Sequence, residues 1–378
     1  MLLGASQGIL LSIFLFSKKI NHTANLVLAV ATIALSIDVF HSAYIMFGYY
    51  KSFPHFTGIT YAFPFLYGPI FYLYAKLIST NSNYFNPKYY LHFIPFILVV
   101  IYGIIFVYLK SSEFKFALIR NELAEPLPGL QMISFLKPIH GIIYVFFTIQ
   151  TVRFYNKKIR NSYSNIERIN LNWLLHLTIG LSIVWGVVVL SYIVRAFSTK
   201  DINMDQFIYM AASVLIYSIG YLSLRQPQIF QPAIQELNGE RLDDSKIKTE
   251  VTSYRKSGLS DTEAQNNLKN LLKVMETDKL YLNSDLTLRE LAEKLSISPH
   301  NLSEILNTRL NQSFYDFINR YRVEEVKRRL ADNDSDKYSL IAIAFDSGFN
   351  SKSSFNTIFK KQTGSTPSQY RNQILPTK

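Results

Sequence analysis

The stretch SLIAIAFDSGFNSKSSFNTIFKKQTGSTPSQYR, residues 339–371, decides the fold of the C-terminal part of the chain. Ile343 lies on the buried face of a first short helix, and Gly348 follows where the chain must take the left-handed conformation. Phe349 can then fill the core beneath the turn, and Ser351 is a typical N-cap. The stretch therefore predicts two short helices joined by a tight turn.

The second of these helices has one apolar face and one polar face. Its apolar residues recur at helical spacing and are expected to be buried: Phe355, Ile358 and Phe359. From Ser347 to the end the chain has five Lys or Arg residues and no Asp or Glu, which suits DNA phosphates. The alternative is a solvated surface, but we predict DNA contacts from Ser351, Lys352, Ser353, Asn356, Thr357 and Lys360.

The same pattern occurs about fifty residues earlier, in LTLRELAEKLSISPHNLSEILNTRL, residues 286–310. Thr287 and Glu290 have the spacing of a capping box that begins a short helix. Ser298 followed by Pro299 begins a second helix after a tight turn. The outer face of this second helix supplies a further set of predicted DNA contacts: His300, Asn301, Ser303 and Glu304.

Between the two helix pairs, residues 313–331 predict one long helix. Phe314, Phe317 and Ile318 share its apolar face, and its basic residues, Arg322 among them, are expected on the remaining faces. Such a helix holds the two pairs at a fixed separation. The second helix of each pair can then enter a major groove of double-stranded DNA.

Residues 280–371 resemble the DNA-binding domain of the AraC/XylS family of transcription regulators. The resemblance rests mostly on residues that follow the family signature in order: Ile343-Ala344, Gly348-Phe349, Ser353, Phe355, Phe359-Lys360-Lys361, Gly364, Thr366-Pro367 and Tyr370-Arg371. It implies two helix-turn-helix units that read adjacent major grooves on one face of the DNA. Two departures, Ser296 and Glu304, suggest that the first helix-turn-helix unit positions the protein more than it selects bases, although Glu304 can also accept a hydrogen bond from cytosine. A third departure is in the second unit, where Thr357 stands at a position that often has Arg in the family, so the resemblance does not carry over that DNA contact.

The N-terminal part has a different composition. Residues 1–225 contain 17 Lys or Arg and 7 Asp or Glu, whereas residues 226–378 contain 22 and 20, so most of the net charge of +12 lies in the apolar half. This distribution is typical of basic loops on the inner side of a membrane. The apolar stretches predict about seven transmembrane helices, near residues 2–17, 25–47, 57–78, 91–109, 132–152, 172–194 and 206–224.

The basic loops also predict the orientation of these spans. With the N-terminus outside, the cytoplasmic connections contain Lys18, Lys19, Lys76, Lys88, Arg153, Lys157, Lys158, Arg160 and Arg168. An odd number of spans then places the C-terminus inside.

Four ionisable residues fall in the outer half of the second and fifth predicted spans: Asp38, His41, Lys137 and His140. Charged groups at membrane depth usually face a partner or a wet cavity. They are therefore candidates for a sensing pocket, and pairing between helices is the alternative.

The sequence predicts three parts: a transmembrane domain at 1–225, a linker at 226–265 rich in polar residues, and the DNA-binding domain at 266–378. A helical pattern at 261–278 either packs on the DNA-binding domain or pairs with a second copy, so a homodimer stays open.

Catalysis is not expected. The chain has no cysteine, no phosphate-binding glycine loop, no His-Glu-x-x-His cluster and no Gly-x-Ser-x-Gly elbow, so we expect no enzyme, cofactor or metal site. A transporter with an accessory DNA-binding domain is a second hypothesis, although the spans show no internal repeat. A third is that the spans only anchor the reader.

The whole arrangement is similar to membrane-anchored members of the AraC/XylS family in Bacteroidetes-type bacteria. That resemblance implies an all-α one-component transcription regulator of the bacterial inner membrane, with its double helix-turn-helix domain in the cytoplasm. Its expected partners are double-stranded DNA, the lipid bilayer and an unidentified signal.

Overall fold

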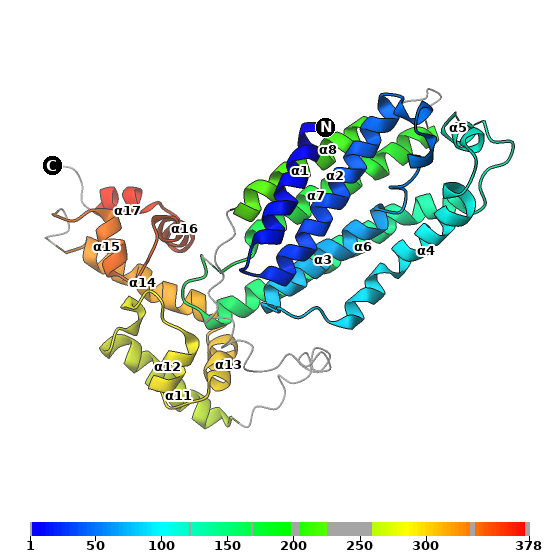
Figure 1. Cartoon of the computed structure of the whole chain (residues 1–378). Coiled ribbons are helices and arrows are strands. Elements are labelled where there is room, and N and C mark those ends of the chain that lie inside the picture. The colour runs from blue at the N-terminus through cyan, green and yellow to red at the C-terminus, as the bar shows by residue number, and fades with distance from the viewer. Residues whose placement is uncertain are drawn as a thin grey trace. The chain divides into compact units, whose positions relative to one another are not determined.

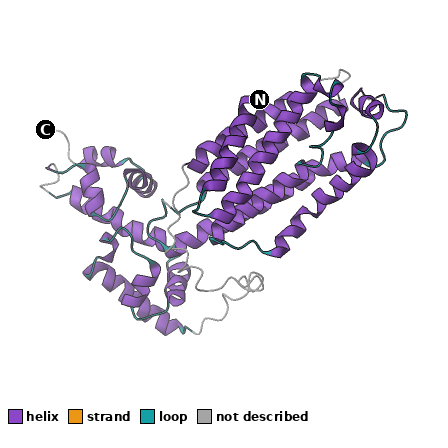
Figure 2. Ribbon diagram, in the orientation of Figure 1, coloured by secondary structure: helices purple, strands orange, loops and turns teal. Residues whose placement is uncertain are grey.

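The computed structural model describes residues 2–120, 122–167, 169–197, 205–224, 259–332 and 337–374. Over these residues the secondary structure is helical (Figure 2). Tyr163 and Thr287 form an isolated antiparallel β-bridge. The chain forms two compact units. The first contains Met1–Tyr155 and Leu171–Leu237, and the second contains Asn156–Asn170 and Asn238–Lys378.

The first unit is a set of packed apolar helices, with α1, α2, α7 and α8 adjacent in Figure 1. Small residues allow close approach, since a Cβ on Gly8 of α1 would lie 2.1 Å from Ser36 Oγ of α2. The helices are α1 (Leu2–Ser17), α2 (His22–Met46), α3 (Pro64–Thr80), α4 (Ile94–Gly103), α5 (Ser112–Arg120), α6 (Leu130–Ser162), α7 (Asn172–Phe197) and α8 (Asp205–Leu224). Short 3-10 turns at Tyr49–Lys51, Pro54–Phe56 and Pro87–Phe93 and a π-helical turn at Ile104–Tyr108 complete the unit.

Among the described residues, four segments are long and apolar enough to cross a membrane: His22–Met46, Pro87–Tyr108, Leu130–Ser162 and Asn172–Val194. Leu2–Ser17 is a shorter apolar helix. Many large apolar side chains on these segments are exposed, including Leu98, Phe135 and Ile183. The apolar character is as expected, but the expected count of seven spans is not confirmed.

The second unit has two hydrophobic cores joined by one helix, α14 (Phe314–Leu330). In Figure 1, α11 and α12 lie on one side of α14 and α15 to α17 on the other. The other helices are α11 (Asp261–Thr277), α12 (Leu288–Lys294), α13 (Pro299–Arg309), α15 (Leu340–Asp346), α16 (Lys352–Thr363) and α17 (Pro367–Ile374), with a 3-10 turn η5 (Leu280–Leu282).

Each half of α14 belongs to a different core. Phe314, Phe317 and Ile318 pack with α11, α12 and α13, whereas Val326 and Leu330 pack with α15 and α16. The two cores of the second unit therefore meet near the middle of α14. This is the helix that the sequence predicts between the two helix pairs.

Helix α11 packs on the first of these cores, where Leu271 and Met275 are fully buried. Of the two alternatives for this helix, packing on the DNA-binding domain is the one observed. Residues 225–258, which hold most of the predicted linker at 226–265, lie outside the described residues.

Candidate nucleic-acid interface

The first helix-turn-helix unit consists of α12 and α13. The Thr287 hydroxyl accepts from Glu290 N at 3.2 Å, and Glu290 Oε2 accepts from Thr287 N at 2.8 Å, which completes the expected capping box. Ser298 caps α13 by accepting from Asn301 N at 3.1 Å. In the turn between them, Ser296 has φ of 56°, a left-handed conformation that favours glycine.

The second helix-turn-helix unit consists of α15 and α16, with Gly348 in the corresponding turn at φ of 92°. A Cβ at this position would lie 2.3 Å from the Tyr281 carbonyl oxygen. Only glycine fits here, because both the conformation and the neighbouring backbone exclude a side chain. Ser351 caps α16 by accepting from Ser354 N at 3.0 Å.

The outward face of α16 is open. Its predicted DNA contacts are all exposed: Lys352, Ser353, Asn356, Thr357 and Lys360. Ser351 is half-buried, because its hydroxyl is used as the cap. The opposite face of the helix holds Phe355 and Phe359 in the second core.

The outward face of α13 is less available. His300 is exposed, but Asn301, Ser303 and Glu304 are half-buried. The Ser303 hydroxyl accepts from Asn307 Nδ2 at 3.2 Å, so part of its hydrogen-bonding capacity is used within the helix. The structure thus presents the two sets of predicted contacts differently, with α16 the more accessible reader.

Comparison with known proteins agrees with this geometry. Residues 291–373 match the family described as "Helix-turn-helix domain". The chain carries an AraC-type DNA-binding domain. The match begins within α12 and extends through α13, α14, α15 and α16, so it includes most of both helix-turn-helix units and the whole of the linking helix α14.

Relatives share this domain. An uncharacterized HTH-type transcriptional regulator of Staphylococcus aureus (strain COL) is 37% identical over 93 residues, which are 25% of this chain and 12% of that protein. The uncharacterized HTH-type transcriptional regulator YtdP of Bacillus subtilis (strain 168) is 24% identical over 192 residues, which are 48% of this chain and 24% of that protein. The chain therefore spans a quarter or less of the length of these relatives.

One solved structure, a protein of unknown function from Listeria innocua, is 29% identical. The alignment covers 29% of this chain and 97% of that one, with a TM-score of 0.25.

A buried arginine lies at the centre of the AraC-type domain. Arg322, expected on an outer face of its helix, is only 2% exposed, which corrects the prediction. Its guanidinium donates to the carbonyl oxygens of Tyr281 at 2.8 Å and Asn283 at 2.8 Å. Burial lowers the pKa of Arg322 to about 10, so the group is still charged at neutral pH. The spacing Ile318, Arg322, Val326, with two apolar neighbours four residues away, is the signal that could have revealed it.

A second buried charge, Glu325, lies one turn further along α14. Its carboxylate accepts from Arg328 Nη2 at 2.7 Å and from Arg329 Nε at 2.8 Å. The hydrogen bond from Arg328, together with that from Arg329, lowers the pKa of Glu325 to about 2 against the cost of burial. Glu325 is therefore ionised and paired throughout the physiological range.

Asp316 is a further charged group of α14, and like Glu325 it was not singled out from the sequence. It accepts from Arg160 at 2.7 and 2.8 Å and from the Ser313 hydroxyl at 2.5 Å, and Lys361 Nζ of α16 lies 3.7 Å away. Burial opposes its ionisation, but the hydrogen bonds from Ser313 and Arg160 outweigh burial and lower the pKa of Asp316. A long-range pair of this kind has no signal in the sequence.

The candidate sensing residues of the first unit gather around the chain at residues 60–67. Tyr67 donates to Asp38 Oδ2 at 2.8 Å, and Thr60 Oγ1 lies 3.2 Å from His41 Nδ1. Lys137 Nζ lies 3.2 Å from the centroid of the Tyr61 ring.

His140 completes this cluster with ring contacts. Its imidazole lies 5.1 Å from the Phe65 ring and 4.8 Å from the Tyr144 ring, between centroids. Both of its ring nitrogens are buried without a hydrogen-bond partner in the described part of the chain. The four residues thus share one neighbourhood, contributed by α2, α6 and the region that begins α3.

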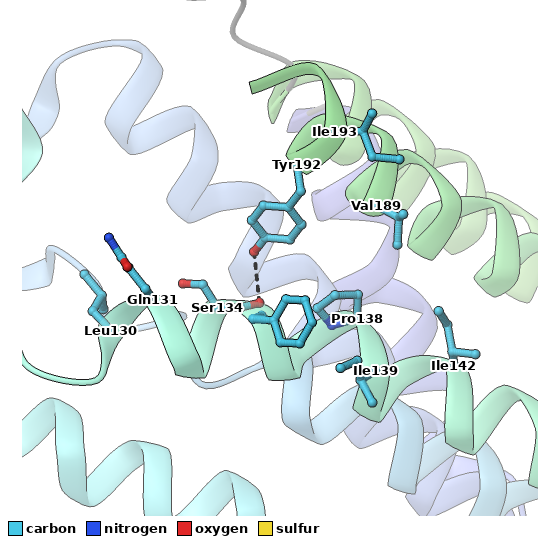
Figure 3. A pocket seen from close by; sticks show the side chains of 10 residues that line it. Leu130, Gln131, Ser134, Pro138, Ile139, Ile142, Val189, Tyr192 and Ile193 are labelled. Carbon is cyan, nitrogen blue, oxygen red and sulfur yellow. Dashed lines mark hydrogen bonds between the residues drawn. The ribbon is translucent and has the colours of Figure 1, made fainter. Parts of the chain in front are cut away.

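A cavity of about 540 Å³ lies beside this cluster, between α6 and α7 (Figure 3). Its wall is mostly apolar, and Tyr192 donates across it to the Ser134 carbonyl oxygen at 3.1 Å. None of Asp38, His41, Lys137 and His140 lines it. Ser134 connects the two regions, because its hydroxyl lies 2.9 Å from the Tyr61 hydroxyl.

Within the described residues, no group of three or more His, Cys, Asp or Glu side chains has the arrangement of a metal site.

Proposed function

We propose that this chain is a membrane-bound one-component transcription regulator, which binds specific DNA through its AraC-type domain under the control of its apolar helical unit. The observation that carries the proposal is the exposed outer face of α16. Lys352 and Lys360 there can contact phosphates, and Asn356 is of the type that hydrogen-bonds an adenine edge. The apolar face beneath them fixes the helix on the second core, so these groups are presented on a rigid support.

The first unit supports a membrane location. Its long apolar helices expose large apolar side chains. Water solvates such side chains poorly, whereas lipid solvates them well. The basic loops favour an outside N-terminus and a cytoplasmic C-terminus in the bacterial inner membrane. This orientation brings the AraC-type domain to the compartment that contains DNA.

A genome-wide map of bound DNA in the native host tests the regulator proposal. The intact protein is compared with a double variant, Lys352→Ala and Asn356→Ala. We expect discrete promoter-proximal peaks that the double variant loses.

The matched control is Asn266→Ala with Lys269→Ala on α11, which removes the same two residue types from an exposed surface outside the readers. Peaks that persist in the reader variant, or vanish equally in the control, would count against the proposal.

We further propose that the cluster of Asp38, His41, Lys137 and His140 responds to the signal. Two observations support this role: Asp38 and Lys137 lie on helices that are long and apolar enough to cross a membrane, and both ring nitrogens of His140 are buried without a hydrogen-bond partner in the described residues. Lys137→Met should change promoter output by about tenfold or more while leaving the amount of membrane-inserted protein unchanged. Lys110→Met, on the loop after the π-helical turn, is the control, and equal output from both variants would contradict the sensing role.

A further inference from the structure

A segment that is distant in sequence from the AraC-type domain is part of the same compact unit. Asn156–Asn170, which comprises the C-terminal end of α6 and the connection to α7, belongs to the second unit. Tyr163 pairs with Thr287 in an antiparallel bridge, and Ser164 N donates to the Leu286 carbonyl oxygen at 3.2 Å. These contacts lie at the start of α12, the first helix of the first helix-turn-helix unit.

The same segment also binds α14 through charged and polar groups. Both Asp316 oxygens accept from Arg160 Nη2, at 2.7 and 2.8 Å, and the Arg160 guanidinium lies 5.0 Å from the Tyr315 ring centroid. The Ser164 hydroxyl, almost fully buried with its residue, accepts from Arg322 Nη2 at 3.0 Å. The Ser164 carbonyl accepts from Arg322 Nη1 at 3.2 Å and from Asn319 Nδ2 at 3.3 Å.

Arg322 makes this docking point important, because it lies where the two cores meet. Besides Ser164, it binds the Tyr281 and Asn283 carbonyls beside the first core. Its Nε also lies 3.0 Å from where a Cβ of Gly348 would be, in the turn of the second reader. Ser164 therefore binds the residue that connects the support of one reader to the turn of the other.

Arg160 lies close to the second reader as well. It lines a cavity of about 670 Å³ together with Asp316 of α14 and Thr357 and Lys361 of α16. Its hydrogen bonds, however, go to Asp316 and not to the predicted DNA contacts. The described contacts of the segment are thus made with α14 and the start of α12, which support the reading helices.

We propose that the 156–170 segment is an intramolecular latch that holds the two helix-turn-helix units in the geometry that binds DNA. The proposal rests on the proposed DNA-binding function and names the route by which the first unit controls it. Because the segment is continuous with α6 and α7, a movement of those helix ends pulls directly on Arg160 and Ser164. Loss of these contacts leaves Arg322 less firmly held, and the two helix-turn-helix units can then move relative to each other. DNA affinity falls, because the two units no longer bind their grooves as one rigid body.

DNA affinity of the full-length protein in lipid nanodiscs tests the latch. The probe is a duplex of about 40 base pairs, enough for two adjacent major grooves with flanks, enriched from a random-sequence pool by the unmodified protein. Arg160→Ala should weaken binding about tenfold, a typical coupling between sites. Lys157→Ala removes the same charge from an exposed position of the same segment and should leave binding within about twofold.

A reversible crosslink separates loss of the latch from loss of folding. The chain has no cysteine, and the partners of an antiparallel bridge have Cα atoms about 4.5–5.5 Å apart, within the range that a disulfide spans. Tyr163→Cys with Thr287→Cys, placed in the Arg160→Ala background, should bind about tenfold more tightly when oxidised than when reduced. The reduced form of the same variant is its own control.

The outcomes are distinct. Equal or tighter binding of Arg160→Ala relative to Lys157→Ala, or no effect of oxidation, overturns the latch. Failure of the proposed function looks different, because Lys352→Ala with Asn356→Ala would then bind the duplex as well as the unmodified protein, or no duplex would be enriched at all.

Discussion

The two helix-turn-helix units have the same architecture but differ in the residue at the turn and in the openness of the reading face. The second helix-turn-helix unit has Gly348 where nothing larger fits, and five of its six predicted DNA contacts are exposed. The first has Ser296 in a left-handed conformation, and a reading helix on which three of four predicted contacts are half-buried. On this comparison we propose that the second helix-turn-helix unit is the principal reader and that the first supports it, since α11 and η5 pack around the core of the first.

The largest expected effect is at the turn of the second unit. Gly348→Ala should destabilise α15 and α16 by about 3 kcal/mol, since it combines a left-handed conformation with an overlap against the Tyr281 carbonyl oxygen. Hydrogen exchange at the amides of these helices, in the full-length protein, measures the change. Ser296→Ala is the matched substitution in the first turn and should cost under about 1 kcal/mol. Equal costs would show that the two turns are equivalent.

The next effect concerns the reading faces. Lys352→Ala with Asn356→Ala should lower DNA affinity about 100-fold, and the loss of one lysine should reduce the salt dependence by about one phosphate contact. His300→Ala with Ser303→Ala should lower affinity less than about tenfold, because that face is less available. Fluorescence anisotropy at several salt concentrations measures both. The reverse order would make the first unit the principal reader.

The pH dependence should be located in the half of α14 that serves the second core. The pKa of Glu325 is lowered to about 2 in the folded domain, so its stabilisation is full above its ordinary value near 4.5 and is lost as the pH falls toward 2. We expect the free energy of unfolding to fall by about 2 kcal/mol over that range. Glu325→Gln should be less stable at pH 7 and should lose most of this slope. A slope that persists unchanged in the variant would assign it to other carboxylates.

The smallest effect is the reverse change at the first turn. Ser296→Gly removes the cost of a left-handed conformation in a residue with a side chain, so it should stabilise α12 and α13 by about 0.5 kcal/mol. Protection of their amides from hydrogen exchange measures it. If the variant is destabilised instead, the turn of the first unit depends on a contact of the serine itself.

Local patterns predicted most of the compact unit that contains the AraC-type domain. Thr287 with Glu290, Ser298 with Pro299, and Gly348 with Phe349 each specify a cap or a turn within a few residues, and the structure has each of them. Arg322 was misplaced because burial of an arginine depends on acceptors supplied by distant backbone. The pairing of Arg160 with Asp316, 156 residues apart in sequence, has no local signal.

In the compact unit of apolar helices, the sequence predicted the helices but not how many of them are long enough to cross a membrane. Helix α3 begins only at Pro64, because the preceding residues form short turns, so the expected span at 57–78 is shortened to 17 helical residues. The four ionisable residues do lie near one another, around the start of α3. Whether a span is continuous depends on local prolines and glycines, which hydropathy alone averages out.

The way the helices of the AraC-type domain begin has a further consequence. Each of α11 to α16 starts at a serine or threonine whose hydroxyl accepts a backbone N–H, namely Ser260, Thr287, Ser298, Ser313, Ser339 and Ser351. Hydroxyl groups do not titrate near neutral pH and carry no net charge for counterions to screen. These hydroxyl caps are thus insensitive to ionic strength, although the Glu263 and Glu290 carboxylates that complete two of them carry charge. The DNA affinity of the domain should be more sensitive, because phosphate contacts weaken steeply as the salt concentration rises. Osmotic changes in the cell would therefore alter occupancy of target sites without unfolding the domain that reads them.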